Sequence, residues 1–433
     1  MVLRSKFFHY MIPSVIAMWV FSIYTIVDGF FVANYTGVHQ LAAVNLSTPF
    51  VTFLFAIAIL FAVGAQTIIG ILLGRGERNR ANQLFTFTTV FILFFSILLT
   101  IVCQIHLDKI IVFLGAEEEY FSYAQDYLHI ILYFAPFFIL SYTFEVLVKI
   151  DGYPLTSIVG VLAASVCNIV LDYLFIARFQ WDVKGAALAT GLAQVLSAIL
   201  FFLHFRMARG YLRFTSFSLQ KQLRHLKTVL FIGFGEAISE MNQGVILFIF
   251  NLFILKFLGD QMIAPFAVIN YISLLVSVTF AGIIQGAQPL ISYYYGAKEK
   301  KKYLKIIKYS LLCVLISSLV FYALVFLFSH HLLGLFLEDP ILTAKTVAPL
   351  RQFGLIFLLA GYSIFVAGAA SAINRPKYSI LINSCRGALI LIPSLIFTIF
   401  VLGRDFFWYA AILSETINFI LSLFVFRKLF LQK

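Results

Sequence analysis

The sequence predicts an all-α integral membrane protein with twelve transmembrane helices in two six-helix lobes. Three observations predict this fold: long apolar runs recur along the chain, basic residues alternate between successive loops, and the second half repeats the first. Of the 433 residues, 62% are hydrophobic and only 12% are charged, whereas a soluble domain averages about 45–50% apolar and about 25% charged residues. The composition is therefore that of a membrane protein.

The apolar runs define the individual helices. Runs of about 20 residues or more recur from end to end, and each is long enough to cross a bilayer as a helix. The alternating pattern of a transmembrane β-barrel is absent. The first run shows no small-residue cleavage site, so we expect it to be a retained helix rather than a signal peptide. The predicted helices lie near residues 10–34, 41–73, 82–105, 120–148, 155–177, 184–205, 226–256, 262–296, 306–329, 346–372, 378–402 and 406–427.

The basic residues predict the orientation of these helices. Of the 31 Lys and Arg, 23 lie at the termini and in one set of alternate loops, Arg209 and Lys433 among them, 7 lie in the opposite loops, and Arg386 lies inside a predicted helix. Because cytoplasmic loops carry the excess of Lys and Arg, both termini are predicted to be cytoplasmic. The net charge of +12 then indicates contact with anionic lipid rather than with nucleic acid. We expect a multi-pass protein of the cell (plasma or inner) membrane, in a prokaryote.

The two halves of the chain are related by a shift of 222 residues. The segment GAQTIIGILLGRGE (64–77) matches GAQPLISYYYGAKE (286–299), and PLTSI (154–158) matches PKYSI (376–380). Because each repeat has an even number of helices, both repeats have the same orientation, as in transporters that bind substrate between two lobes. We predict a first lobe at residues 1–213, a cytoplasmic linker at 214–225 and a second lobe at 226–433.

Ionisable residues at membrane depth are candidates for function, because each costs at least about 2.5–3.5 kcal/mol in hydrocarbon. At about 1.5 Å of rise per helical residue, Asp28, Asn168, Asp172 and Thr190 fall in one layer of the outer half of the first lobe, and Ala186 lies one helical turn above Thr190. The repeat does not copy Asp28, because position 250 is Phe. The duplicated residues therefore indicate architecture, and the unduplicated polar residues indicate function.

This first-lobe set predicts a site for a small cation. Carboxylate, amide and hydroxyl oxygens suit a hard cation, to which the backbone carbonyl of Ala186 could add a ligand. Two close carboxylates could bind Na⁺ at Asp28, Asn168, Asp172 and Thr190, or exchange a proton. In the alternative interpretation, Asn168 and Thr190 only join two helices, and Asp172 lies at the outer interface near Arg178.

The second lobe carries a different polar set near the predicted midplane. Glu236 and Glu240 lie one turn apart, with Arg386 and Glu415 on later helices. Two interpretations remain open: either glutamate attracts a cationic substrate, or an ion pair with Arg386 fixes the lobe. Outside this set, Glu145 and Lys149 are predicted to form a snorkelling pair at the cytoplasmic interface.

Together these motifs resemble the multidrug and toxic compound extrusion (MATE) transporters along the whole chain. The resemblance rests on Pro13 before Asp28, on Asn168-x-x-x-Asp172 and on Ala186-x-x-x-Thr190. It also rests on the segments IVDGFFVANYTGVHQLAAV (26–44), NLFILKFLGDQMIAPFAVINY (251–271) and QGAQPLISYYYGAK (285–298).

The resemblance implies an antiporter that exports bulky, often cationic drugs or metabolites in exchange for Na⁺ or H⁺. It implies that the first-lobe set holds the coupling cation and that the first helix bends near Pro13, where proline permits a kink. It implies no cofactor, and we expect a monomer. Some members carry a second cation site with an aspartate on helix ten, but residues 355–374 contain no acid here.

Other classes of protein fit the sequence less well. An enzyme would need a catalytic or metal-binding set, but no HExxH or GxSxG is present. A lipid-linked oligosaccharide flippase of the same broader superfamily would need several basic residues in its cavity, where only Arg386 is available. A channel does not explain the two-fold repeat as well as two rocking lobes do.

Overall fold

The computed structural model describes residues 2–207, 210–337 and 339–432. Arg209 and Lys433, which were counted above among the basic residues, lie outside this described part. The described residues form helices and no strands, and twelve helical stretches are long and apolar enough to cross a membrane. The predicted all-α fold and the predicted number of spans are therefore confirmed.

The helices follow the predicted order, with short helical segments between some of them. The first half contains α1 (Val2–Tyr35), α2 (Val38–Gly74), α3 (Arg78–Ile105), α4 (Leu107–Phe113), α5 (Glu118–Ile150), α6 (Pro154–Asp172), η1 (Tyr173–Arg178) and α7 (Asp182–Arg206). The second half contains α8 (Leu219–Phe257), η2 (Asp260–Met262), α9 (Ile263–Gly296), α10 (Lys300–Gly334), α11 (Pro340–Gly354), α12 (Phe357–Ala372), α13 (Pro376–Ser384), η3 (Cys385–Leu389), α14 (Ile390–Phe397), η4 (Thr398–Leu402), η5 (Arg404–Phe406), α15 (Tyr409–Phe426) and η6 (Arg427–Leu431).

The predicted linker at 214–225 is shorter than expected. Helix α8 begins at Leu219, so the second part of that range is helical. The residues from 219 to 225 contain no Gly or Pro and consist largely of Leu, Gln, Lys and Arg, all of which favour helix. The non-helical connection therefore ends at Ser218.

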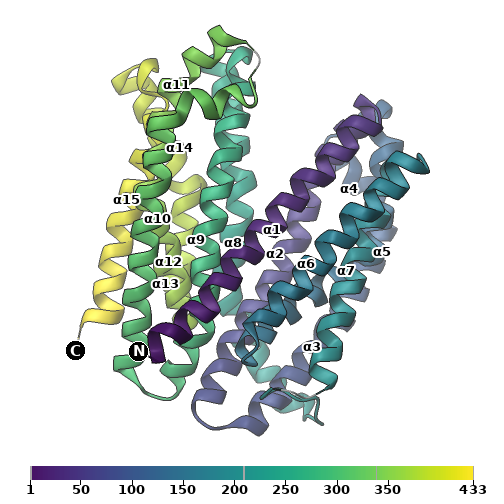
Figure 1. Cartoon of the computed structure of the whole chain (residues 1–433), viewed down its shortest axis with the longest axis vertical. Coiled ribbons are helices and arrows are strands. Elements are labelled where there is room, and N and C mark those ends of the chain that lie inside the picture. Colours follow the sequence, from purple (N-terminus) through teal and green to yellow (C-terminus); the bar gives the residue numbers. More distant parts are fainter. Residues whose placement is uncertain (1, 208–209, 338, 433) are drawn as a thin grey trace.

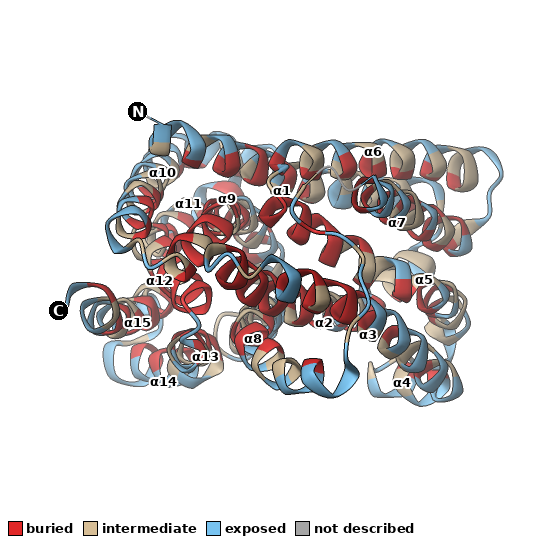
Figure 2. Cartoon of the chain, turned by 90° about the horizontal axis from the view of Figure 1, so that it is seen from below, coloured by how far each residue is buried: buried red, intermediate tan, exposed pale blue. Residues whose placement is uncertain are grey.

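The two halves of the chain form two groups of helices that separate at one end and converge at the other (Figure 1). Both termini lie near the converging end (Figure 1). Viewed from below, the buried residues gather in the middle of the bundle, mainly on α2, α9 and α12, and the outer helices expose their outward faces (Figure 2). The converging end is thus closed by packing between the halves.

The repeated glycines explain how closely the halves approach. A Cβ atom on Gly74 would overlap the carbonyl oxygen of Tyr293, and one on Gly296 would overlap the carbonyl oxygen of Ile71. The 222-residue shift converts each of these contacts into the other. Only glycine lets the two backbones touch in this way, so the repeated motif forms the two-fold interface itself.

The first helix of each half extends onto the other half. The N-terminal part of α1 packs on α9, where Gly286 touches the backbone of Met11, and its later part packs on α6. Phe7 and Tyr10 belong to the apolar core of the second half. Helix α8 repeats this arrangement by packing on α2. Helix α1 therefore connects the outer part of one half to the core of the other.

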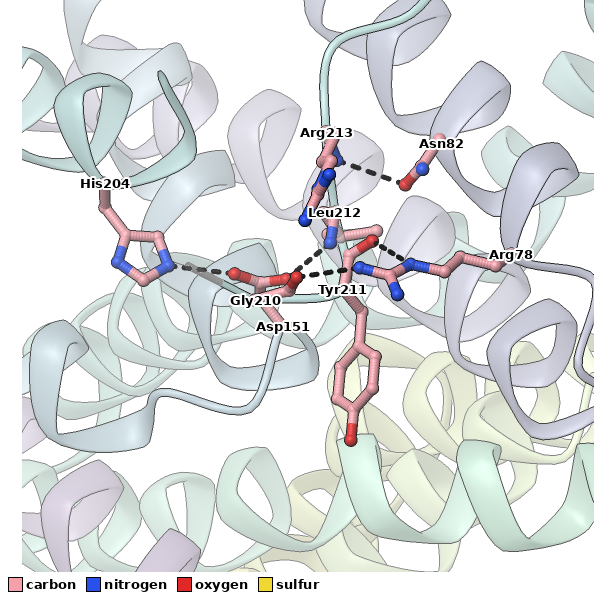
Figure 3. Close-up of polar contacts among 8 residues, drawn as sticks. All are labelled: Arg78, Asn82, Asp151, His204, Gly210, Tyr211, Leu212 and Arg213. Atoms are coloured by element: carbon pink, nitrogen blue, oxygen red, sulfur yellow. Dashed lines mark hydrogen bonds and ion pairs between the residues drawn. The ribbon is translucent and has the colours of Figure 1, made fainter. Parts of the chain in front are cut away.

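The connection between the halves is attached to the first half. Three side chains spaced four residues apart on α3 bind its backbone. Arg78 donates to the carbonyl oxygens of Gly210 and Tyr211, and Asn82 accepts from the backbone N–H of Arg213 (Figure 3). Thr86 accepts from the backbone N–H of Thr215. Four helical residues rise about 6 Å, close to the length of two extended residues at about 3.3 Å each. The spacing on α3 therefore matches alternate residues of the extended chain.

A buried carboxylate completes this attachment. Asp151 accepts from the backbone N–H of Leu212 at 2.6 Å and pairs with Nε2 of His204 at 2.9 Å (Figure 3). A side chain on Gly210 would collide with the Asp151 carboxylate, so glycine is required there. The connection is thus anchored to the first half, up to Phe217, whose ring packs on Phe87 of α3.

Candidate functional site

The four oxygen-bearing residues predicted in the first lobe come together on three helices. Asp28 is on α1, Asn168 and Asp172 are one turn apart on α6, and Thr190 is on α7. Helix α6 packs against both α1 and α7. The Asp28 carboxyl lies within hydrogen-bonding reach of Asp172, and Asn168 Nδ2 donates to Thr190 Oγ1 at 3.4 Å. The predicted layer is therefore one continuous polar cluster.

This cluster has too few hydrogen-bond donors. Oδ1 of Asp28, Oδ1 of Asn168 and both carboxyl oxygens of Asp172 are buried and accept no hydrogen bond from the described residues. Asp172 is completely inaccessible to solvent. Buried polar oxygens normally have partners, because an unpaired one costs free energy. Two carboxyl groups within reach of one another need a shared proton or a cation between them.

Asp172 and Arg178, which the alternative interpretation places together near the outer interface, have different surroundings. Asp172 is fully buried, whereas Arg178 is exposed at the end of the π-helical segment η1. Such π-helical turns occur frequently at functional sites. The Asn168–Thr190 contact does join two helices, but it leaves the Asn168 oxygen available to a ligand.

Two tyrosines beside the cluster were not predicted. Tyr24 and Tyr127 lie within electrostatic range of both Asp28 and Asp172. Tyr24 is one helical turn before Asp28, so the four-residue spacing on α1 could have identified it. Tyr127 comes from α5, which no sequence spacing relates to Asp28.

Two further predicted residues lie near this cluster along the chain. Ala186 is buried in the apolar core formed with Val32 and Val183, and the role of its carbonyl as a ligand stays a prediction. Pro13 lies inside a continuous α1, where the Ser14 hydroxyl donates to the Tyr10 carbonyl. The bend at Pro13 likewise stays a prediction.

The second-lobe residues do not form the predicted ion-pair network. Glu236 accepts from the hydroxyls of Ser371 and Ser379 at 3.0 and 3.5 Å. Glu240 accepts only from Gln243, at 3.4 Å, among the described residues.

Arg386 instead pairs with Glu415, with Nε and Oε2 3.3 Å apart. The predicted ion pair between Arg386 and Glu236 or Glu240 is therefore wrong. Arg386 lies in the π-helical segment η3 beside Gly387, whose ψ of −141° is not helical. This irregular backbone invalidates a placement based on regular helix geometry.

The Glu145–Lys149 pair is buried rather than interfacial, which corrects the prediction of snorkelling side chains. Their side chains are 9% and 1% exposed, with Nζ and Oε1 2.7 Å apart. Lys149 also donates to Oε1 of Gln285 at 2.9 Å, and Gln285 donates to the Tyr142 hydroxyl at 3.1 Å. Gln285 belongs to α9, so the other half of the molecule covers this ion pair.

Comparison with known proteins identifies the family. The MatE family model matches residues 13–174 and 237–396, which together make up most of the chain. The multidrug export protein MepA of Staphylococcus aureus is 26% identical over 88% of this chain and 84% of its own length. The MepA of Staphylococcus saprophyticus is 25% identical, with coverages of 94% and 90%.

Solved structures show the same fold. The Vibrio cholerae MATE transporter VcmN superposes with a TM-score of 0.92, covering 99% of this chain and 97% of its own, at 18% identity. The family predicted from the sequence is thus confirmed, and with it the prediction of a transporter rather than an enzyme. The chain belongs to the MatE family, the multidrug and toxic compound extrusion (MATE) transporters.

Proposed function

We propose that this protein is a secondary active antiporter that exports bulky, often cationic drugs or metabolites in exchange for Na⁺ or H⁺. The observation that carries the proposal is the cluster at Asp28 and Asp172, whose buried oxygens have no donor. The names of the staphylococcal relatives, both multidrug export proteins, support the substrate class.

The position of Asp28 on α1 supports a coupling mechanism. Na⁺ or H⁺ bound between Asp28 and Asp172 would remove the repulsion between two buried carboxylates. Helix α1 carries Asp28 at one end and packs on α9 of the second half at the other. Cation binding at Asp28 would therefore change how α1 packs between the halves. Alternating access requires such a change, because a ligand shifts the equilibrium between the inward-open and outward-open states only if it binds them with different affinities. Pro13 lies within the stretch of α1 that packs on α9, between the contacts of Met11 and Val15 with that helix, so a bend there would change this packing.

The alternation of basic residues supports one orientation of the protein in the membrane. The chain is a multi-pass membrane protein, and its converging end carries both termini (Figure 1). With the termini in the cytoplasm, the end at which the two halves converge would face the cytoplasm, and the end at which they separate would face outward. One subunit contains both halves, which supports a monomer.

Substrate would enter between the halves and meet acidic groups of the second lobe. Glu240 accepts only a long hydrogen bond from Gln243 among the described residues, so it is free to bind a cationic group. Glu236 accepts hydrogen bonds from two serines, so its carboxylate is less available to a substrate than that of Glu240. The alternative function, a lipid-linked oligosaccharide flippase, is not favoured, because the half-buried Arg386 and the buried Lys149 are already paired with Glu415 and Glu145.

Dye efflux from liposomes tests the proposal. The protein would be reconstituted with ethidium inside, and Na⁺ and H⁺ gradients would be imposed separately. Wild type should export the dye under one of the gradients, and Asp28→Asn should not. Asp260→Asn, an exposed acid on η2, is the matched control and should behave as wild type. Equal gradient-driven efflux by wild type and Asp28→Asn would refute the coupling role.

A further inference from the structure

A shallow groove on the outer surface of the molecule combines basic and apolar residues. It has a volume of about 1140 Å³ and lies between the first turns of α1 and the start of α6. Arg4, Lys6 and His9 line it near the terminus of α1, and Ile12 and Leu155 line it further along.

The chemistry of the groove changes along α1. The three basic side chains are exposed within the first three turns of the helix, at the converging end of the molecule. Ile12 and Leu155 are 49% and 53% exposed. They form the apolar part of the groove, further from the N-terminus of α1. A positive region followed by an apolar one matches a phospholipid, with its charged phosphate at the interface and its chains in hydrocarbon.

The groove also lies on the boundary between the two halves. Its α1 wall is fixed to the second half, because Phe7 and Tyr10 are buried in the core around α9. Its other wall, at Leu155, belongs to α6 of the first half. Helices α1 and α6 run side by side along one outer edge of the molecule (Figure 2). A molecule in the groove would touch both halves at once.

We propose that this groove binds one anionic phospholipid of the cytoplasmic leaflet, with its phosphate at Arg4 and Lys6 and an acyl chain along Ile12 and Leu155. Basic pockets between transmembrane helices on the cytoplasmic side bind anionic headgroups in this way. The inference rests on the orientation proposed above but not on the coupling ion. Its failure would leave the antiport proposal untouched.

Lipid titration followed by native mass spectrometry tests the inference. Purified, delipidated full-length protein would be titrated with phosphatidylglycerol and, in parallel, with zwitterionic phosphatidylcholine. Wild type should retain one phosphatidylglycerol in preference to phosphatidylcholine. The double variant Arg4→Gln, Lys6→Gln should bind it roughly 25-fold more weakly, because each basic side chain near the headgroup contributes about fivefold.

A matched control removes the same charge elsewhere. Lys300 and Lys301 are exposed at the start of α10 and do not line the groove. Lys300→Gln, Lys301→Gln should therefore weaken binding by less than the roughly fivefold effect of one basic side chain. An equal loss in both double variants would indicate a general attraction to basic surface and would overturn the site.

A second variant protects the test against misfolding of the charge variant. Leu155→Trp keeps every charge and fills the apolar part of the groove, so it should weaken retention of phosphatidylglycerol and leave the elution volume of the protein unchanged. Unchanged affinity in Leu155→Trp would overturn the placement of the acyl chain. Displacement of the lipid by inorganic phosphate, at an ionic strength where chloride does not displace it, would show a simple anion site and overturn the lipid.

Discussion

The two halves of the molecule place side chains of different polarity at equivalent positions. The 222-residue shift maps the first-lobe cluster of Asp28, Asn168, Asp172 and Thr190 onto Phe250, Ile390, Ser394 and Ile412. Phe250 is 1% exposed, and its ring stacks on Phe266 with centroids 5.0 Å apart. The second lobe thus packs an aromatic ring where the first lobe holds a carboxylate with too few partners.

The reverse comparison gives the same result. The second-lobe set of Glu236, Glu240, Arg386 and Glu415 maps back onto Ser14, Met18, Ala164 and Ala193. The glycines of the central interface, in contrast, occur in both halves and make reciprocal contacts. Residues that both halves share build the interface, and residues that only one half carries supply its charge. The predictions below test this division, from the largest expected effect to the smallest.

Substitutions at the equivalent positions 28 and 250 should change stability in opposite directions. Phe250→Ala should lower the free energy of unfolding by about 3–5 kcal/mol, as is usual for a buried aromatic residue. Asp28→Asn should raise it, because it removes a carboxylate whose buried Oδ1 accepts no hydrogen bond from the described residues. Thermal unfolding in detergent measures both changes, and Phe250→Leu controls for loss of volume alone. Destabilisation by Asp28→Asn would mean that the carboxylate is a structural partner.

The Glu145–Lys149 pair can be replaced by the residues that the second half has at the equivalent positions, which tests whether the ion pair is needed for stability. Lys149→Met should cost about 3–5 kcal/mol, because it leaves a buried charge without its partner. The equivalent positions in the second half are Ala367 and Ser371. The double variant Glu145→Ala, Lys149→Ser should therefore be more stable than Lys149→Met alone. Equal instability of the two variants, measured by thermal unfolding, would show that the pair is needed for more than charge balance.

The interface glycines should respond equally in the two halves. Gly74→Leu and Gly296→Leu each place a side chain against backbone of the other half and should each cost about 1–3 kcal/mol by overpacking. Gly244, which has open space around its Cα, provides the control substitution Gly244→Leu. Thermal unfolding and dye efflux should both fall in the two interface variants. A strong effect at only one of them would break the proposed two-fold equivalence.

Much of this arrangement could be predicted from the sequence, because the relevant signals are local. Apolar runs predict the helices, the 222-residue repeat predicts the reciprocal glycine contacts, and four-residue spacing places Asn168 with Asp172. The burial of Lys149 could not be predicted in this way, because Gln285 covers it from the other half. The sequence placed Glu415 in one set with Arg386 but did not identify it as the paired acid, because a π-helical segment breaks the regular geometry that the depth estimate assumes.

The central claim is that the first-lobe carboxylates hold the coupling cation, and equilibrium binding tests it most directly. Uptake of radioactive Na⁺ and release of protons on a step to higher pH, both without substrate, would be measured on purified wild type, Asp28→Asn, Asp172→Asn and the second-lobe variant Glu240→Gln. The account predicts that wild type and Glu240→Gln bind or release the ion, and that both first-lobe variants do not. Full ion binding in Asp28→Asn and Asp172→Asn, with loss in Glu240→Gln, would contradict the account and place the coupling site in the second lobe.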